Sequence, residues 1–182
     1  MNVIETALPG VLIIEPKVFG DARGFFFESF HAERYRAAGV TCDFVQDNVS
    51  RSARGVLRGL HFQNPKSQAK LVQVLEGTVV DVAVDVRRGS PSFGRHVLVE
   101  LSAENRRQLY VPAGFAHGFC VTSEHALFSY KCSDLYSPAD EHGICWDDPD
   151  LGIRWPIEAP SLSAKDAAYP RLRDLSESVL PG

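Results

Sequence analysis

The sequence contains few cysteines and none of the spacings that bring thiols together as metal ligands. Its four cysteines, at positions 42, 120, 132 and 145, lack the C-x-x-C pairing of zinc knuckles and thioredoxin-like motifs. We therefore interpret them as reduced, mostly buried thiols. No segment reaches the roughly 18 consecutive apolar residues of a membrane helix, and the N-terminus lacks a basic segment followed by an apolar one. These absences predict a cytoplasmic protein without a membrane association.

The sequence also lacks an excess of basic residues. The 19 Lys and Arg residues are outnumbered by 23 Asp and Glu residues, giving a net charge of -4. Because no Lys/Arg stripe stands out, we expect no nucleic-acid partner. The 182 residues, 45% of them hydrophobic, suit one globular domain over residues 1–182 with a sizeable core. No internal repeat or linker divides the chain.

Helical periodicity is scarce, and alternating apolar segments dominate the chain. They predict strands over 12–14, 25–27, 71–75, 79–86, 97–101, 109–111 and 119–130. Glu76-Gly77 has the composition of a hairpin turn. Helices are expected only over 31–38 and, interrupted by Pro170, over 163–175. The pattern favours an all-β jelly-roll sandwich or barrel with a few short peripheral helices.

One segment combines groups suited to removing a proton from carbon. The run 58–63 reads Arg-Gly-Leu-His-Phe-Gln, and Lys70 follows it. Histidine can act as a base near neutral pH, lysine can stabilise an oxyanion, and arginine can bind a phosphate. Since Arg58 and His61 are three residues apart, a regular strand would direct them to opposite faces. A bulge at Gly59 would bring them to the same face.

Each candidate also has a structural interpretation. His61 could be a buried core histidine, Lys70 a solvated edge residue, and Tyr130 a core aromatic. Asp166 closes the string Ser-Ala-Lys-Asp, which resembles a capping box at a helix N-terminus. Gln46-Asp47-Asn48 could be only a polar loop. From the residues alone these alternatives stay open.

Several sequence strings, in their order along the chain, resemble those of a known family. The strings, in order, are GDARGFFFESF, FVQDNVS, GLHFQ, VPAGFAHGF, FSYKCSDLYSPADEHGICWDDPDLGIRWP and LSAKD. Together they resemble the dTDP-4-dehydrorhamnose 3,5-epimerase family of the cupin superfamily, over about residues 4–174. The ordered set is more specific than any single string.

The resemblance implies an isomerase that inverts C3 and C5 of dTDP-4-dehydro-6-deoxy-D-glucose without a cofactor, in dTDP-L-rhamnose biosynthesis. It implies that His61 removes the protons, that Asp166 orients His61, that Lys70 stabilises the enolate and that Tyr130 returns a proton. The residues that it implies in substrate binding are Arg23, Glu28, Gln46, Asn48, Arg58, His117, Tyr136, Glu141 and Lys165. It further implies a homodimer in which the segment 23–28 completes the partner's nucleotide site.

Many cupins bind a metal through paired histidines and a glutamate. Here the first motif reads His61-Phe62-Gln63 and lacks its second histidine, while His117 resembles a remnant of the second motif. We predict no metal. Three other functions stay open: an epimerase of one carbon only, a metal-dependent cupin enzyme, and a noncatalytic cupin that binds sugar nucleotides. Tyr136 is an alternative to Tyr130 as the proton donor.

Overall fold

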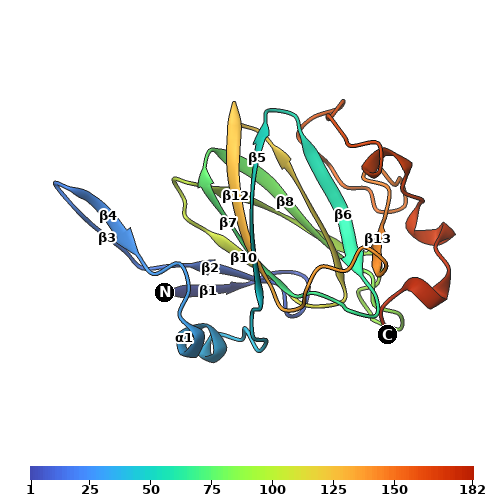
Figure 1. Ribbon diagram of the computed structural model, residues 1–182, viewed down its shortest axis with the longest axis horizontal. Helices are drawn as coiled ribbons and strands as arrows, with labels where there is room; N and C mark the ends of the chain where they lie inside the picture. Colours follow the sequence, from blue (N-terminus) through green and yellow to red (C-terminus); the bar gives the residue numbers. More distant parts are fainter.

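The computed structural model describes residues 1–182 as two facing antiparallel sheets with one projecting hairpin (Figure 1). The first sheet has the order β1-β2-β10-β7-β12-β5, and the second has the order β13-β6-β11-β8-β9. The strands are β1 (Asn2–Glu5), β2 (Leu12–Glu15), β3 (Val18–Asp21), β4 (Gly24–Phe27), β5 (Gln46–Ala53), β6 (Leu57–Gln63), β7 (Lys70–Glu76), β8 (Thr78–Asp85), β9 (His96–Ser102), β10 (Gln108–Val111), β11 (Phe115–Val121), β12 (His125–Cys132) and β13 (Glu141–Gly143). The helical elements are α1 (Ala32–Ala37) and the 3-10 turns η1 (Asp166–Ala168), η2 (Leu172–Asp174) and η3 (Glu177–Val179). The predicted all-β jelly-roll fold is confirmed.

The main core lies between the two sheets. Alternate residues of each strand point inward, so that Val72 and Phe128 of the first sheet pack in one cluster with Phe115 and Phe119 of the second. The rings of Phe119 and Phe128 stack with their centroids 4.0 Å apart. This contact joins the sheets directly beside the cavity described below.

A second core lies on the outer face of the second sheet. Leu60 and Phe62 of β6 pack there with Ile144 and with Leu172 of the C-terminal segment. In Figure 1 this segment, coloured orange to red, runs alongside β6 and β13. The packing brings η1 against β6.

Several predicted boundaries were wrong. The segment 119–130, expected to be one strand, contains the end of β11 and most of β12, and the chain turns between them at residues 122–124. The turn at Glu76-Gly77 does not form a hairpin, because it carries the chain from β7 in one sheet to β8 in the other. The expected helix 163–175 is two separate 3-10 turns, as Pro170 cannot donate a backbone hydrogen bond. The helix predicted over 31–38 is confirmed as α1.

Strand β6 contains the bulge that the spacing of its charged residues predicted. His61 lies opposite His117, whereas Arg58 lies opposite Phe119, so β6 carries one residue more than β11. Gly59 has a φ of 133°, and a Cβ atom there would lie 2.5 Å from the Cα of Gly118. The close approach requires glycine, and it turns Arg58 and His61 to the same side of the sheet.

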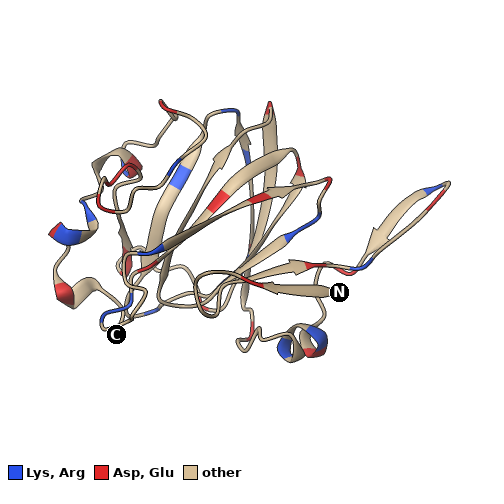
Figure 2. Ribbon diagram, turned by 180° about the vertical axis from the view of Figure 1, so that it is seen from behind, with Lys and Arg blue, Asp and Glu red and all other residues tan.

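The hairpin β3–β4 projects away from both sheets (Figure 1). Its Phe25 and Phe26 are 59% and 65% exposed, so the alternative of a strand buried within this chain is wrong. In Figure 2 basic and acidic residues mix along loops and strand ends, and both kinds occur at the hairpin tip. None of the helices has the length and apolar character needed to cross a membrane.

Candidate active site

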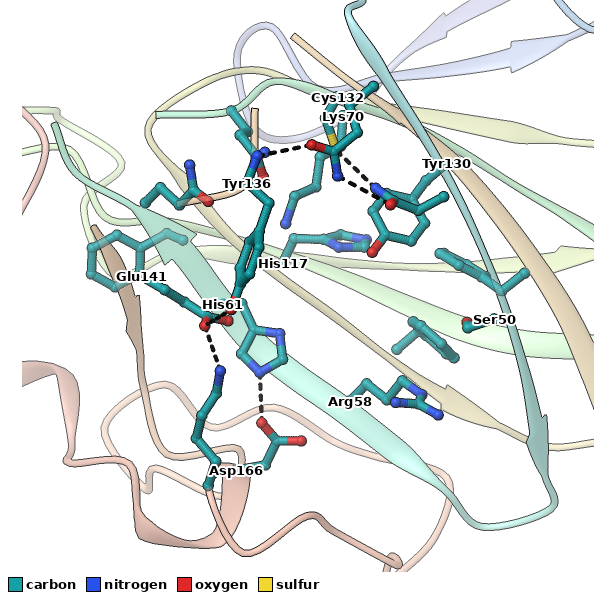
Figure 3. Close-up of a pocket in the computed structure, with 18 of the residues that line it drawn as sticks. Ser50, Arg58, His61, Lys70, His117, Tyr130, Cys132, Tyr136, Glu141 and Asp166 are labelled. Carbon is teal, nitrogen blue, oxygen red and sulfur yellow. Dashed lines mark hydrogen bonds and ion pairs between the residues drawn. The ribbon is translucent and has the colours of Figure 1, made fainter. Parts of the chain in front are cut away.

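A cavity of about 430 Å³ opens between the two sheets (Figure 3). Strands β5, β7 and β12 form one wall, while β6, β11, β13 and the turn η1 form the other. The predicted site residues that line it are Gln46, Asn48, Arg58, His61, Lys70, His117, Tyr130, Tyr136, Glu141, Lys165 and Asp166. Residues that lie far apart in the sequence, from Gln46 to Asp166, therefore line the same cavity.

His61 and Asp166 form a hydrogen-bonded pair at this cavity. The Nε2 atom of His61 lies 2.6 Å from Oδ1 of Asp166, which is 4% exposed. Burial raises the pKa of the Asp166 carboxyl, but the hydrogen bond and charge of His61 outweigh it and leave the pKa below its ordinary value. An ionised carboxylate only accepts hydrogen bonds, so Nε2 of His61 donates. In neutral imidazole this leaves the lone pair on Nδ1 available as a base.

The turn η1 shows only half of the capping box that its sequence resembles. The Ser163 hydroxyl accepts a hydrogen bond of 3.0 Å from the backbone N–H of Asp166. The Asp166 carboxylate faces His61 (Figure 3). The cap is therefore made by Ser163, and the carboxylate of Asp166 pairs with the histidine.

Lys70 begins β7, which lies between β10 and β12, so the interpretation as a solvated edge residue is wrong. Its ammonium group makes no hydrogen bond or ion pair with the rest of the chain. Burial lowers the pKa of Lys70, while the negative charge of Asp81 and Glu141 acts in the opposite direction. A poorly hydrated cation of this kind interacts strongly with an anion that forms beside it.

His117 belongs to a second histidine–carboxylate pair, which lies deeper. Its Nε2 atom is 2.9 and 3.0 Å from the two carboxylate oxygens of Asp81, a fully buried residue. Burial raises the pKa of Asp81, against the effect of the nearby His117 and Lys70. Sequence reasoning missed Asp81, although an acid in the centre of the apolar strand β8 was a visible signal.

Tyr130 extends from β12, on the wall opposite β6 (Figure 3). Its ring packs against Phe128, with centroids 5.9 Å apart, and its hydroxyl has no hydrogen-bond partner within the chain. Burial raises the pKa of the phenol, although the charge of Arg58 opposes this effect. Tyr130 therefore stays protonated at neutral pH and can donate a proton across the cavity from His61.

Tyr136, by contrast, is engaged with other side chains. Its hydroxyl donates a hydrogen bond of 2.7 Å to Glu141, whose carboxylate also pairs with the Lys165 ammonium. Burial raises the pKa of Glu141, but Lys165 and Tyr136 outweigh it and the pKa lies below its ordinary value. Because this hydrogen bond also raises the pKa of Tyr136, the phenol holds its proton against Glu141.

The alternative of a polar loop at Gln46-Asp47-Asn48 is wrong, because these residues begin β5. Gln46, Asn48 and Ser50 alternate along this strand and face the cavity, and the Ser50 hydroxyl is buried without a partner. Ser52, the next residue in the row, accepts a hydrogen bond of 3.1 Å from Nε of Arg58. Gln46 and Asn48 were identified as site residues from the sequence, but Ser50, which continues the same row of polar residues, was missed.

Two predicted site residues lie outside the cavity of their own chain. Arg23, at the tip of the β3–β4 hairpin, pairs with Asp21, and its side chain is 89% exposed. Glu28 pairs with Arg34 of α1. Neither residue lines the cavity of its own chain. Their predicted contacts with a substrate would therefore require a different arrangement of chains.

The histidines are not grouped as metal ligands. The structure contains no set of three or more His, Cys, Asp or Glu side chains placed to hold a metal ion, and all four cysteines are free. The absence of a metal requirement stays a prediction. What the cavity does contain is a base, an ammonium group and a protonated phenol, which together suit proton transfer at a carbon beside a carbonyl group.

Known proteins resemble this chain over nearly its whole length. The family model described as dTDP-4-dehydrorhamnose 3,5-epimerase matches residues 5–174. The dTDP-4-dehydrorhamnose 3,5-epimerase of Shigella flexneri is 57% identical over 168 residues, which cover 91% of this chain and 93% of that protein. The protein of the same name from Salmonella typhimurium strain LT2 is 57% identical over 175 residues, covering 94% and 96%. The crystal structure of the dTDP-6-deoxy-D-glucose-3,5-epimerase of Legionella pneumophila, in complex with dTDP-4-keto-L-rhamnose, matches with a TM-score of 0.97 and 55% identity, covering 99% and 97%.

Proposed function

Because the chain belongs to the dTDP-4-dehydrorhamnose 3,5-epimerase family, we propose that it converts dTDP-4-dehydro-6-deoxy-D-glucose into dTDP-4-dehydro-L-rhamnose by inverting C3 and C5. The observation that carries the proposal is the placement of His61 and Tyr130 on facing walls of one cavity. Inversion requires a base on one face of the sugar and an acid on the other. The product belongs to dTDP-L-rhamnose biosynthesis.

The chemistry follows from the 4-keto group, which acidifies the hydrogens at C3 and C5. Nδ1 of His61 removes a proton, and the Asp166 carboxylate stabilises the imidazolium that forms. The electrons of the broken C–H bond move to the C4 oxygen, where the Lys70 ammonium stabilises the enolate. Tyr130 then protonates the same carbon from the opposite face.

Each inversion leaves an additional proton on His61 and a phenolate at Tyr130. Proton exchange with water restores both groups before the second carbon reacts. No electrons are gained or lost overall, so we propose that the reaction needs no redox cofactor. Solvent hydrogen thereby enters the product at each inverted carbon, which makes the reaction easy to follow.

We propose that the remaining predicted residues bind the nucleotide part of the substrate. Arg58 offers a guanidinium group suited to phosphate, and Ser52 orients it. Gln46, Asn48, His117, Tyr136, Glu141 and Lys165 provide hydrogen-bonding groups around the same cavity. Binding energy from thymidine diphosphate, remote from the reacting carbons, then positions the sugar ring.

A solvent-exchange experiment tests the activity. Chelator-treated protein is incubated with dTDP-4-dehydro-6-deoxy-D-glucose in heavy water, and the sugar is examined by NMR. We expect deuterium at C3 and C5 together with inversion at both carbons. Deuterium at one carbon alone would identify a single-centre epimerase. Tight binding without any deuterium would contradict an epimerase and favour a noncatalytic binding protein.

We further propose a homodimer in which the β3–β4 hairpin completes the partner's nucleotide site. Two observations support it: Phe25 and Phe26 are exposed on the hairpin, and Arg23 and Glu28 lie outside the cavity of their own chain. Aromatic residues of this kind are enriched in protein interfaces. A second copy would cover the rings and supply the guanidinium group of Arg23.

Mixing two inactive variants tests this arrangement. The Arg23→Ala chain retains His61, and the His61→Asn chain retains Arg23. If Arg23 serves the partner's site, dimers refolded from a mixture contain one complete site, and activity returns above the sum of the separate variants. A mixture that stays at that sum, although sedimentation shows mixed dimers, would contradict the exchange of Arg23. Arg23→Ala mixed with itself is the control.

We also propose that residues 1–182 act as one domain in the cytoplasm. The shared core between the two sheets supports the single domain. The four free thiols suit a reducing compartment.

A further inference from the structure

Tyr169 contacts the proposed base without lining the cavity. Its ring meets the imidazole of His61 edge to face, with ring centroids 5.7 Å apart and an angle of 67° between the planes. The residues around the cavity include His61 and Asp166 but not Tyr169. Tyr169 therefore supports the histidine from behind, and its hydroxyl also lies near Lys165 of the cavity wall.

The position of the Tyr169 ring depends on Gly143. This glycine is the residue of β13 that lies opposite His61 of β6. A Cβ atom at Gly143 would lie 2.5 Å from Cζ and 2.6 Å from Cδ2 of the Tyr169 ring. Any larger residue at position 143 would push the ring off the strand and away from its contact with His61.

Both contacts to His61 come from one short stretch of chain. Asp166 binds Nε2 of the imidazole, and Tyr169 follows three residues later. The next residue, Pro170, accepts a backbone hydrogen bond of 2.8 Å from Cys145, two residues after Gly143. The carboxylate and the aromatic ring are thus fixed to β13 as one unit.

The two contacts restrict different motions. A hydrogen bond at Nε2 fixes the position of one ring atom but leaves the imidazole able to pivot, since rotation about χ2 of histidine has broad minima. An aromatic edge-to-face contact favours one angle between the planes. We propose that Tyr169, packed on Gly143, is a positioning residue that fixes the imidazole plane of His61 and keeps Nδ1 directed into the cavity.

The inference rests on the proposed function for its kinetic consequence, so its test combines turnover with a substrate-free measurement. In Tyr169→Ala the imidazole loses its packing partner, and we expect kcat to fall by about 10- to 100-fold, with KM changed by less than about threefold. In Tyr169→Phe the ring remains, and kcat should return to near the wild-type value. Burial raises the pKa of Tyr169 to about 12, so the phenylalanine variant replaces a neutral group by a neutral group. Gly143→Ala should reproduce the loss seen in Tyr169→Ala.

NMR of 15N-labelled histidine in the free protein provides the second measurement. We expect sharp His61 signals, with Nε2 protonated, in the wild type and in Tyr169→Phe. In Tyr169→Ala the Asp166 carboxylate still holds the proton on Nε2, but the ring should lose its fixed orientation, and its signals should broaden. This spectrum does not depend on the identity of the sugar, so it decides the role of Tyr169 even if the proposed substrate is wrong.

Leu172→Ala is the matched control. Leu172 packs the same C-terminal segment onto the second sheet, in a cluster with Leu60 and Phe62, and makes no contact with the His61 ring. The variant should unfold at a lower temperature but retain kcat and the sharp His61 signals. Equal kcat losses in Leu172→Ala and Tyr169→Ala would overturn the proposal, because Tyr169 would then only anchor the segment. Wild-type kcat and sharp His61 signals in Tyr169→Ala would overturn it as well.

Discussion

The His61→Asn variant is expected to lose exchange of the C3 and C5 hydrogens with solvent, by about 10²–10⁴-fold or more. Asparagine keeps a polar side chain at this position, but it has no basic nitrogen to face the sugar. The measurement is deuterium incorporation from heavy water, followed by NMR. Calorimetry with dTDP should show binding close to that of the wild type.

His125→Asn is the matched control for this variant. His125 begins β12 and its Nε2 atom lies 3.4 Å from the exposed carboxylate of Glu76, away from the cavity. It should exchange hydrogens as the wild type does. Normal exchange in His61→Asn would show that another group is the base, and the most direct candidate would then be the pair of His117 and Asp81.

The Tyr130→Phe variant is expected to separate proton removal from inversion. His61 still forms the enolate, so deuterium should continue to enter the sugar from the face of the base. Return of a proton from the opposite face should fall by about 10²–10⁴-fold, because the phenylalanine ring has no proton to donate. NMR coupling constants of the product report inversion in the same sample that reports deuterium content.

Tyr136→Phe distinguishes the two tyrosines. The Tyr136 hydroxyl already donates to Glu141, and the residue is half exposed, so we expect weaker substrate binding with inversion retained. The burial that raises the pKa of Tyr130 keeps that phenol protonated through neutral and mildly alkaline pH. Normal inversion in Tyr130→Phe together with its loss in Tyr136→Phe would reverse the assignment.

The bulge in β6 was predictable from the sequence because two expectations conflicted. Strand alternation places Arg58 and His61 on opposite faces, whereas a shared site requires them on one face, and a bulge at Gly59 resolves the conflict. Strand β5 was not predicted as a strand, because it lies at a sheet edge and its polar residues show no apolar periodicity. The β3–β4 hairpin was predicted only in part, since Phe25 and Phe26 stay largely exposed and do not enter the core of their own chain.

The candidate site was predictable mainly through the family resemblance. His61 and Asp166 are 105 residues apart in the sequence, and no local pattern indicates that they pair. Asp81 and Tyr169 were missed for a different reason: both act from behind the cavity wall, on His117 and His61, and neither lies in a string that suggested catalysis. The sequence shows Asp81 only as an acid within an apolar strand, and its pairing with His117, like the contact of Tyr169 with His61, follows only from the packing.

The construction of the cavity also determines when it can form. Its walls come from strand pairs of large sequence separation, such as β5 with β12 and β6 with β13, so the fold has a high contact order. Closing such long loops is entropically unfavourable until both strands are in place, and folding of β-sheet domains of this kind takes milliseconds to seconds. A chain that has recovered most of its strands can therefore still lack the segment that carries Asp166. During refolding, catalytic competence should be the last property to return.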